Sequence, residues 1–509
     1  MILYNSITIK YLNMKKSLFV SFAFAASLFV SAQQKNSLLD AAFWKTSPTV
    51  ETVQAEIAKG NNPAEANANA FDVTTLAINN DAPFATIKFL VEQPGNSVTK
   101  LTHDNRIYLH WAAYRGNAEL VQYLIDKGSD VNFEDSHGTA PADFAASNGQ
   151  SNPALYDSFF KAGLNPTKKY ANGANLLLLA IASDKDLKAA EYFSTKGMSL
   201  KDVDNDGNTA FSYAARSGNI ALLKKLLEKG IKPTDTALLF AAQGSRRETN
   251  TLETYKYLVE EVKIKATAQN KAGQNVLHIL AGKPNQTEII QYFLAKGVDL
   301  NKADKEGNTP LMAAASARET GILELFLPKV KNINAQNLKG ESALTFAVRN
   351  GSPEAVNLLL AKGADVNVKD KDGNNLGVYL VQSYRPAGRE KAATDPFDAK
   401  AKLLQEKGLD LAAPQKDGNT LYHLAITKND VSLLKKITDL KVDINAKNKD
   451  GLTALHRAAM TSKDDAILKY LVSAGAKKDI STEFDETAYA LAKENEVLTK
   501  NNISVEFLK

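Results

Sequence analysis

The sequence predicts an all-α solenoid built from stacked helix–turn–helix repeats. A glycine turn recurs along the chain with a period of about 33 residues, and two helical segments follow each turn. With 509 residues, the chain is longer than one compact domain, which also favours a repeat array. The recurring turn glycines are Gly138, Gly173, Gly207, Gly273, Gly307, Gly340, Gly373, Gly418 and Gly451.

Each predicted repeat contains a turn, a short helix and a longer helix. Glycine suits the turn because it adopts positive φ without strain, and Asn105 and Asp485, which replace it in two repeats, tolerate the same conformation. The short helix is rich in small residues, as in "ALHRAAMTS" at 454–462. The longer helix has leucine and valine at helical spacing and stops at a glycine, as in "PEAVNLLLAKG" at 353–363.

This repeat resembles the ankyrin repeat. The segments "DKEGNTPLMAAA" (304–315) and "KGADVNVKDKDGN" (362–374) match that family's turn, inner helix and closing loop. The resemblance implies an ankyrin-repeat solenoid of about 14 units, joined by short β-hairpin turns, from Leu38 to the C-terminus. It also implies a concave groove and a row of turn tips that bind other proteins.

The spacing between repeats collapses at one place. The units at Thr209 and Thr236 are only 27 residues apart, and Pro233 lies in the shortened link, which has no room for a turn hairpin. We therefore expect an N-terminal array over 33–231 and a C-terminal array over 232–509 that ends in a cap. The stack is expected to be kinked or split between them.

The N-terminal segment has the layout of a secretory signal peptide. A basic start at Met14 is followed by an apolar stretch and a small-residue exit at Ala32, so 14–32 is the expected signal and 1–13 an upstream extension. The alternative is a membrane anchor, but the apolar core falls short of the roughly 20 residues that a spanning helix needs. We expect cleavage after Ala32, no membrane insertion afterwards, and a periplasmic or extracellular protein.

Charge and cysteine content narrow the possible functions. Removing the three lysines of residues 1–32 from the net charge of +5 leaves a mature chain near neutrality, at +2, with both signs interspersed. That pattern disfavours nucleic acid as a partner. The chain has no cysteine, so thiol catalysis, cysteine-type zinc sites and iron–sulfur clusters are excluded. No cofactor or metal is expected.

Four histidines occupy one position of the repeat and invite a catalytic or metal-binding interpretation. Other repeats have aspartate, serine, methionine or threonine there, which a base or ligand position could not tolerate. In the ankyrin family this imidazole ties the turn to the neighbouring unit, so we expect a structural role. The four residues are His110, His278, His423 and His456.

Aromatic residues follow this position in several repeats. They suggest either a binding stripe or core packing, and core packing is expected because the family places a buried leucine there. These residues are Trp111, Phe144, Tyr213, Phe240 and Phe346.

Large polar residues at groove and turn positions are the candidate partner-binding residues. Arginine and tyrosine are enriched in interface hot spots, and these positions are expected to make little contact with the core. The groove and turn candidates are Tyr114, Arg115, Arg216, Arg349 and Arg106.

Two insertions, 244–251 and 383–398, enlarge the connection between inner and outer helix. Insertions in solenoids often lie on the binding face. The second contributes the candidates Tyr384, Arg385 and Arg389, although a tolerated loop without function is an equal alternative.

The expected function is protein–protein interaction by an exported, monomeric, non-enzymatic repeat protein. No phosphate loop, nucleophile elbow or other catalytic constellation is recognisable. Two alternatives stay open: an accessory or inhibitor subunit of an envelope enzyme, and a polyanion binder.

Overall fold

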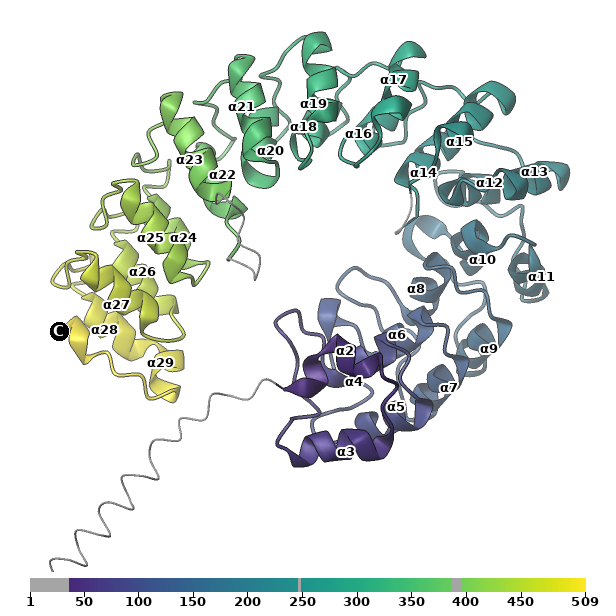
Figure 1. The fold of residues 1–509 in the computed structure, drawn as a ribbon, viewed down its shortest axis with the longest axis horizontal. Helices are drawn as coiled ribbons and strands as arrows, with labels where there is room; N and C mark the ends of the chain where they lie inside the picture. Colours follow the sequence, from purple (N-terminus) through teal and green to yellow (C-terminus); the bar gives the residue numbers. More distant parts are fainter. Residues whose placement is uncertain (1–35, 246–248, 387–395) are drawn as a thin grey trace, which may run out of the picture. The chain divides into compact units, whose positions relative to one another are not determined.

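The computed structural model describes residues 36–245, 249–386 and 396–509. The expected signal peptide therefore lies outside the described residues. In the described part, fourteen inner helices are each followed along the chain by an outer helix, which confirms the predicted solenoid of about fourteen units. Figure 1 shows the arrangement clearly for α20, α22 and α24, each of which lies beside the outer helix that follows it.

The inner helices are short. They are α2 (Ala41–Trp44), α4 (Val73–Asn79), α6 (Tyr108–Tyr114), α8 (Pro141–Ser147), α10 (Leu176–Ala180), α12 (Ala210–Ala214), α14 (Ala237–Gln243), α16 (Val276–Leu280), α18 (Pro310–Ala315), α20 (Ala343–Asn350), α22 (Leu376–Ser383), α24 (Leu421–Ile426), α26 (Ala454–Thr461) and α28 (Ala488–Glu494).

The outer helices reach eleven residues in α23. They are α3 (Val50–Ala58), α5 (Phe84–Val91), α7 (Ala118–Asp126), α9 (Pro153–Lys161), α11 (Lys188–Thr195), α13 (Ile220–Glu228), α15 (Leu252–Lys256), α17 (Thr287–Ala295), α19 (Gly321–Phe326), α21 (Pro353–Ala361), α23 (Pro396–Glu406), α25 (Val431–Asp439), α27 (Ala466–Ser473) and α29 (Glu496–Lys500).

Single helical turns complete the secondary structure. They are η1 (Ser37–Leu39), η2 (His103–Asn105), η3 (Ala171–Gly173), η4 (Ile181–Ser183), η5 (Ala215–Ser217), the π-helical η6 (Tyr257–Glu261), η7 (Leu327–Lys329) and η8 (Glu506–Leu508).

The chain forms two compact units. The first comprises residues up to Ala171 together with 191–198, and the second comprises 172–190 and 199–509. The boundary expected at 231/232 lies inside the second unit. Whether fragments divided there fold independently stays a prediction.

Helix α21 illustrates why the outer helices form. The Ser352 side chain accepts a hydrogen bond from the Ala355 N–H at the N-cap, and Pro353 occupies the first helical position, where its missing N–H costs nothing. Val356 and Leu359 lie on the buried face. After the helix ends, Gly363 adopts a φ of 88°, which glycine tolerates without a side-chain clash.

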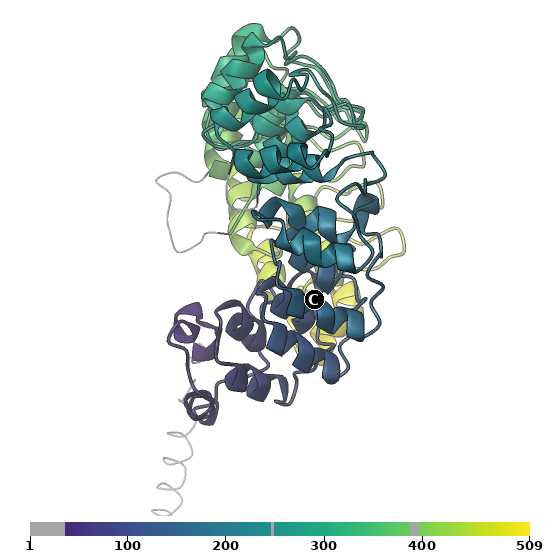
Figure 2. The ribbon, with the colours of Figure 1, turned by 90° about the vertical axis from the view of Figure 1, so that its right-hand side faces the viewer.

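Adjacent hairpins within each unit are joined through their backbones. The N–H of Lys305 donates to the carbonyl of Ala272 at 2.8 Å, and the N–H of Lys371 donates to that of Lys339 at 2.9 Å. Figure 2 shows the loops of the teal repeats gathered on one side of the helices. The hairpins contain only isolated β-bridges in the described residues, such as Gln336 with Ser342.

The turn residues that replace glycine behave as expected. Asn105 has a φ of 58° and Asp485 a φ of 61°, which confirms the prediction of a left-handed turn position in both repeats. Gly340 shows a second requirement besides φ. A Cβ atom there would lie 2.7 Å from the backbone nitrogen of Lys371, so the hairpins can approach this closely only with glycine.

Outer helices of adjacent repeats share a recurring contact, here called a clasp, in which a tyrosine and a lysine of one helix both reach one acidic residue of the preceding repeat. Tyr292 and Lys296, one helical turn apart on α17, both reach Glu260 of the preceding repeat, at 3.1 and 3.0 Å. Two further copies of this clasp join repeats in the first unit: Tyr123 and Lys127 with Glu92, and Tyr192 and Lys196 with Asp157.

The shortened link at 232–236 is bonded to the repeat before it. Thr209 donates to the carbonyl of Lys232 at 2.8 Å, and the hydroxyls of Ser212 and Thr234 lie 2.6 Å apart. Lys271 of the next hairpin pairs with Asp206, so the hairpins on either side of the link meet directly. The link therefore continues the stack of the second unit.

None of the helices in the described residues combines the length and apolar composition required to cross a membrane.

Candidate protein-binding surface

Each of the four histidines connects its own repeat to the hairpin of the next repeat. The Nε2–H of His456 donates to the carbonyl of Ile480 at 2.9 Å, and that of His423 donates to Leu452 at the same distance. His110 and His278 make the equivalent bonds to Thr139 and Asn308. The predicted structural role is thereby confirmed for all four.

The other ring nitrogen of His456 is also used. Its Nδ1 accepts a hydrogen bond from the Thr453 N–H at 3.0 Å, which fixes the neutral tautomer with the proton on Nε2. Burial lowers the pKa of His456, because the charged imidazolium would lose its hydration. The ring has no free lone pair with which to act as a base.

Asp143 occupies the same position in the repeat that begins at Gly138, with a different result. Its side chain is buried, and Oδ1 has no hydrogen-bond partner in the described residues. Burial raises the pKa of Asp143 to about 7, despite backbone hydrogen bonds that oppose the shift.

The aromatic row after the histidine position is largely part of the core. Trp111, Phe144 and Tyr213 are buried, which confirms core packing for them, whereas Phe240 and Phe346 are half-buried. The polar tips bond to the hairpin of the same repeat. Trp111 Nε1 donates to Thr102 Oγ1, and the Tyr213 hydroxyl donates to Asp204.

Three of the candidate arginines lie against these rings. The Arg106 guanidinium is 4.4 Å from the ring centre of Phe144 and 5.2 Å from that of Trp111. Arg216 and Arg349 repeat this arrangement in the second unit, over Phe240 at 4.9 Å and Phe346 at 4.8 Å. We call Arg106, Arg216, Arg349 and these four rings the arginine–aromatic row.

Arg106 and Tyr384 are more buried than the other candidates in the described residues. Arg106 was expected to make little core contact, but it is buried and pairs with Asp135 at 2.8 Å and Asp104 at 2.9 Å. Tyr384, expected on an inserted loop, is also buried, and its hydroxyl donates to Asp430. The expectation of little core contact was wrong for Arg106 because Asp135 and Phe144 of the following repeat enclose its side chain. Tyr384 lies on the loop after α22, as expected, and its role in binding stays a prediction.

The remaining candidates are more accessible. Tyr114 is half-exposed and stacks on Phe144 at 5.4 Å, and Arg115 donates through Nε to Asp81 at 2.9 Å. Arg216 donates to Gln243, and Arg349 pairs with Glu341. Arg385 is exposed, whereas Arg389 lies outside the described residues. Their role in binding stays a prediction.

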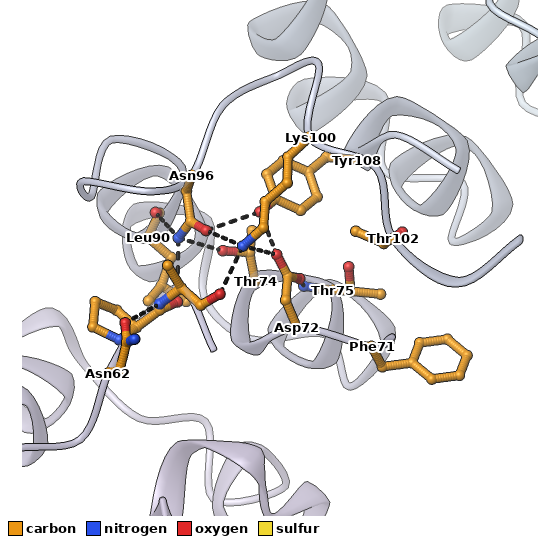
Figure 3. Close-up of polar contacts among 12 residues, drawn as sticks. Asn62, Phe71, Asp72, Thr74, Thr75, Leu90, Asn96, Lys100, Thr102 and Tyr108 are labelled. Atoms are coloured by element: carbon orange, nitrogen blue, oxygen red, sulfur yellow. Dashed lines mark hydrogen bonds and ion pairs between the residues drawn. The ribbon is translucent and has the colours of Figure 1, made fainter. Parts of the chain in front are cut away.

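A buried polar cluster near the N-terminus was missed from the sequence (Figure 3). The Tyr108 hydroxyl donates to Asp72 at 2.5 Å, and Lys100 Nζ lies 2.8 Å from the same carboxylate. Lys100 also donates to Asn96 and to the carbonyl of Ala64. Burial raises the pKa of Tyr108, and the charges are satisfied within the cluster, so it joins segments of the fold.

The match to a family model agrees with this architecture. A family model described as "Ankyrin repeats (3 copies)" matches residues 74–156, 152–237, 277–370 and 392–496. Among solved structures, the ankyrin repeat domain of Bcl-3 aligns with a TM-score of 0.35 and 21% identity, covering 45% of this chain and 100% of that domain.

Curated relatives match over short stretches. The palmitoyltransferase AKR1 of Lachancea kluyveri is 32% identical over 30% of this chain and 21% of its own length. The human transient receptor potential cation channel subfamily A member 1 is 29% identical over 41% of this chain and 19% of its own.

Human ankyrin repeat domain-containing protein 53 is 36% identical over 20% of each chain. The chain spans about a fifth of the length of these three relatives. The family model, in contrast, covers more than half of the chain, and the chain belongs to the ankyrin repeat family.

Proposed function

We propose that this protein is exported and binds a partner protein through its inner-helix face and turn tips, without catalysing a reaction. The arginine–aromatic row is the observation that carries the proposal. Arg216 and Arg349 are partly exposed, and rings together with Gln243 or Glu341 already hold their guanidinium groups. Side chains fixed before binding lose little conformational entropy when a partner arrives.

Tyr114 and Arg115 offer a surface of the same kind within the first unit. Tyr114 offers a half-exposed ring that is already stacked on Phe144, and Arg115 is held by Asp81. Both combine a large contact area with directional donors, which is the profile of interface anchors.

Affinity purification from the cell envelope fraction, followed by titration of the captured partner, tests the binding surface. Tyr114→Ala, Arg115→Ala, Arg216→Ala and Arg349→Ala are compared with Lys435→Ala, an exposed residue of outer helix α25. At least one of the four should weaken binding by about 1 kcal/mol or more with an unchanged melting temperature. Normal binding by all four variants would contradict the proposal.

The captured partner also separates the two alternatives. Co-purification of an enzyme whose activity changes on binding would favour an accessory or inhibitor subunit. A steep loss of binding with salt would favour a polyanion.

Export has its own test. Sequencing of the mature N-terminus should begin near Gln33. An intact Met14 in a cytoplasmic fraction would contradict export.

A further inference from the structure

One junction in the second unit is built differently from its neighbours. Val378 stands where His423 and His456 stand in later repeats and cannot donate to the next hairpin. The connection is made instead by a reciprocal amide pair. The Asn375 N–H donates to Gln415 Oε1 at 2.9 Å, and Gln415 Nε2 donates to Asn375 Oδ1 at 3.0 Å.

The hairpin tips also lack a bond at this junction. Lys371 and Lys449 donate their backbone N–H groups to the preceding hairpin, at 2.9 and 3.0 Å. Lys416 occupies the equivalent position in the hairpin at 415–419. Its backbone N–H donates to no carbonyl of the preceding hairpin in the described residues. The two hairpins are therefore joined at their base, and at their tips the stem of Lys416 packs against Gly373 in place of a backbone bond.

A cavity of about 430 Å³ opens between these hairpins. The Asn375–Gln415 pair forms one wall, and Leu409 and Pro414 supply apolar surface. Gly373 leaves room for the stem of Lys416, since a Cβ at Gly373 would lie 2.6 Å from Lys416 Cδ. The cavity thus follows from the residues that make this junction unusual.

The lining of this cavity carries a net positive charge. Lys369 and Lys416 are exposed, and neither forms a salt bridge with another described residue. The acid in the lining is Asp410, whose carboxylate accepts a hydrogen bond from the Ala412 N–H at 2.9 Å. Two cations beside an apolar surface complement a carboxylate that has an apolar neighbour.

We propose that this cavity binds an acidic side chain, flanked by an apolar residue, of a partner protein. The proposal rests on the proposed protein-binding function and gives it a second contact point at the turn tips. The carboxylate lies between Lys369 and Lys416, and the apolar neighbour covers the exposed ring of Pro414.

Fluorescence polarisation with a labelled Gly-Leu-Glu-Leu-Gly peptide tests the cavity on the full-length mature chain. The double variant Lys369→Gln/Lys416→Gln should weaken binding about fivefold or more, because both charge-assisted bonds are lost. The matched control Lys305→Gln/Lys449→Gln changes net charge equally on other hairpins and should bind normally. A second variant, Ala413→Phe, fills the cavity without changing charge and should also weaken binding at an unchanged melting temperature.

Several results would overturn the proposal. Absence of peptide binding, or equal weakening in both double variants, would show that the cavity is not a specific site. Displacement of the peptide by free glutamate at similar concentration would indicate a small-anion site instead. Because the peptide has a defined sequence, failure here leaves the Tyr114, Arg115, Arg216 and Arg349 titrations unaffected.

Discussion

Two repeats of the same design differ at one buried position. In the repeat at 451–480, His456 donates to the next hairpin and accepts from its own N-cap, so both ring nitrogens are bonded. In the repeat at 138–170, Asp143 has an oxygen without a partner in the described residues. A neutral hydrogen-bond donor is therefore favoured at this buried position. An acid there either stays protonated or carries a charge whose burial costs free energy.

The two repeats should consequently respond to pH in opposite directions. A histidine whose folded pKa is lowered destabilises the repeat as pH falls below its unfolded pKa, near 6.5. An acid whose folded pKa is raised from 3.8 to about 7 destabilises the repeat as pH rises through that range. The residue at this single position therefore determines whether the stability of its repeat rises or falls with pH.

Replacing His456 with aspartate should have the largest effect on stability. His456→Asp removes the bond to Ile480 and buries a carboxylate, so the repeat should lose about 3 kcal/mol or more at pH 8. The loss should be smaller at pH 5, because the acid can take up a proton. Hydrogen exchange over 451–480 measures it, and His456→Asn, which keeps a neutral donor, is the control. Equal losses for Asp and Asn at pH 8 would contradict the comparison.

Neutralising the natural acid should have the next largest effect. Raising the pKa of Asp143 from 3.8 to about 7 lowers the free energy of unfolding at high pH by up to about 4 kcal/mol. Asp143→Asn should therefore raise the free energy of unfolding by up to that amount at pH 8 and have little effect near pH 4. Both tryptophans of the chain, Trp44 and Trp111, lie in the first unit. Urea unfolding followed by their emission therefore reports on this unit.

The exposed Asp126→Asn is the control for this variant. A gain at pH 8 in Asp126→Asn as large as in Asp143→Asn would rule out burial as the cause.

Simple truncation of the histidine should have a smaller effect. His456→Ala removes one hydrogen bond and some packing but leaves no buried charge, so it should cost on the order of 1 kcal/mol. The metal content of the purified protein should not change. Stoichiometric metal that disappears with the mutation would refute the structural role.

The smallest effect is expected at the shortened link, where Ser212 takes the place of the histidine and its hydroxyl lies 2.6 Å from that of Thr234. At the shortened link, Lys271 and Asp206 form an exposed pair between the flanking hairpins, and Lys271→Ala should barely change the melting temperature. Fragments 33–231 and 236–509 should each fold. One fully cooperative transition of the whole chain, with neither fragment soluble, would show that the link couples strongly.

The fold was predictable because its signal repeats. A period near 33 residues, amphipathic outer helices and left-handed turn positions each recur many times, so local sequence determines local structure, including φ at Asn105 and Asp485. The histidine position was predictable for the same reason.

The surface was less predictable because its contacts join different repeats. Arg106 is enclosed by Phe144 and Asp135 from the following repeat, which local sequence does not indicate. For Arg349 a signal existed, since it follows Phe346 by three positions, the spacing that places the two on one helix face. The ring beside Arg216 in the arginine–aromatic row, Phe240, comes instead from the next repeat. The Asp72–Lys100–Tyr108 cluster unites three separate segments and left no motif in the sequence.

Hydrogen exchange of the wild-type protein at pH 5.5 and pH 8, corrected for intrinsic rates, tests the central comparison most directly. Between these values the opening free energy should rise over 451–480. Over 138–164 the opening free energy of the wild type should fall between these pH values when it is compared with that of the Asp143→Asn variant. Both proteins contain His110, so the contribution of this histidine cancels in the comparison. A change in the same direction in both segments, or no difference between wild type and Asp143→Asn, would contradict the account.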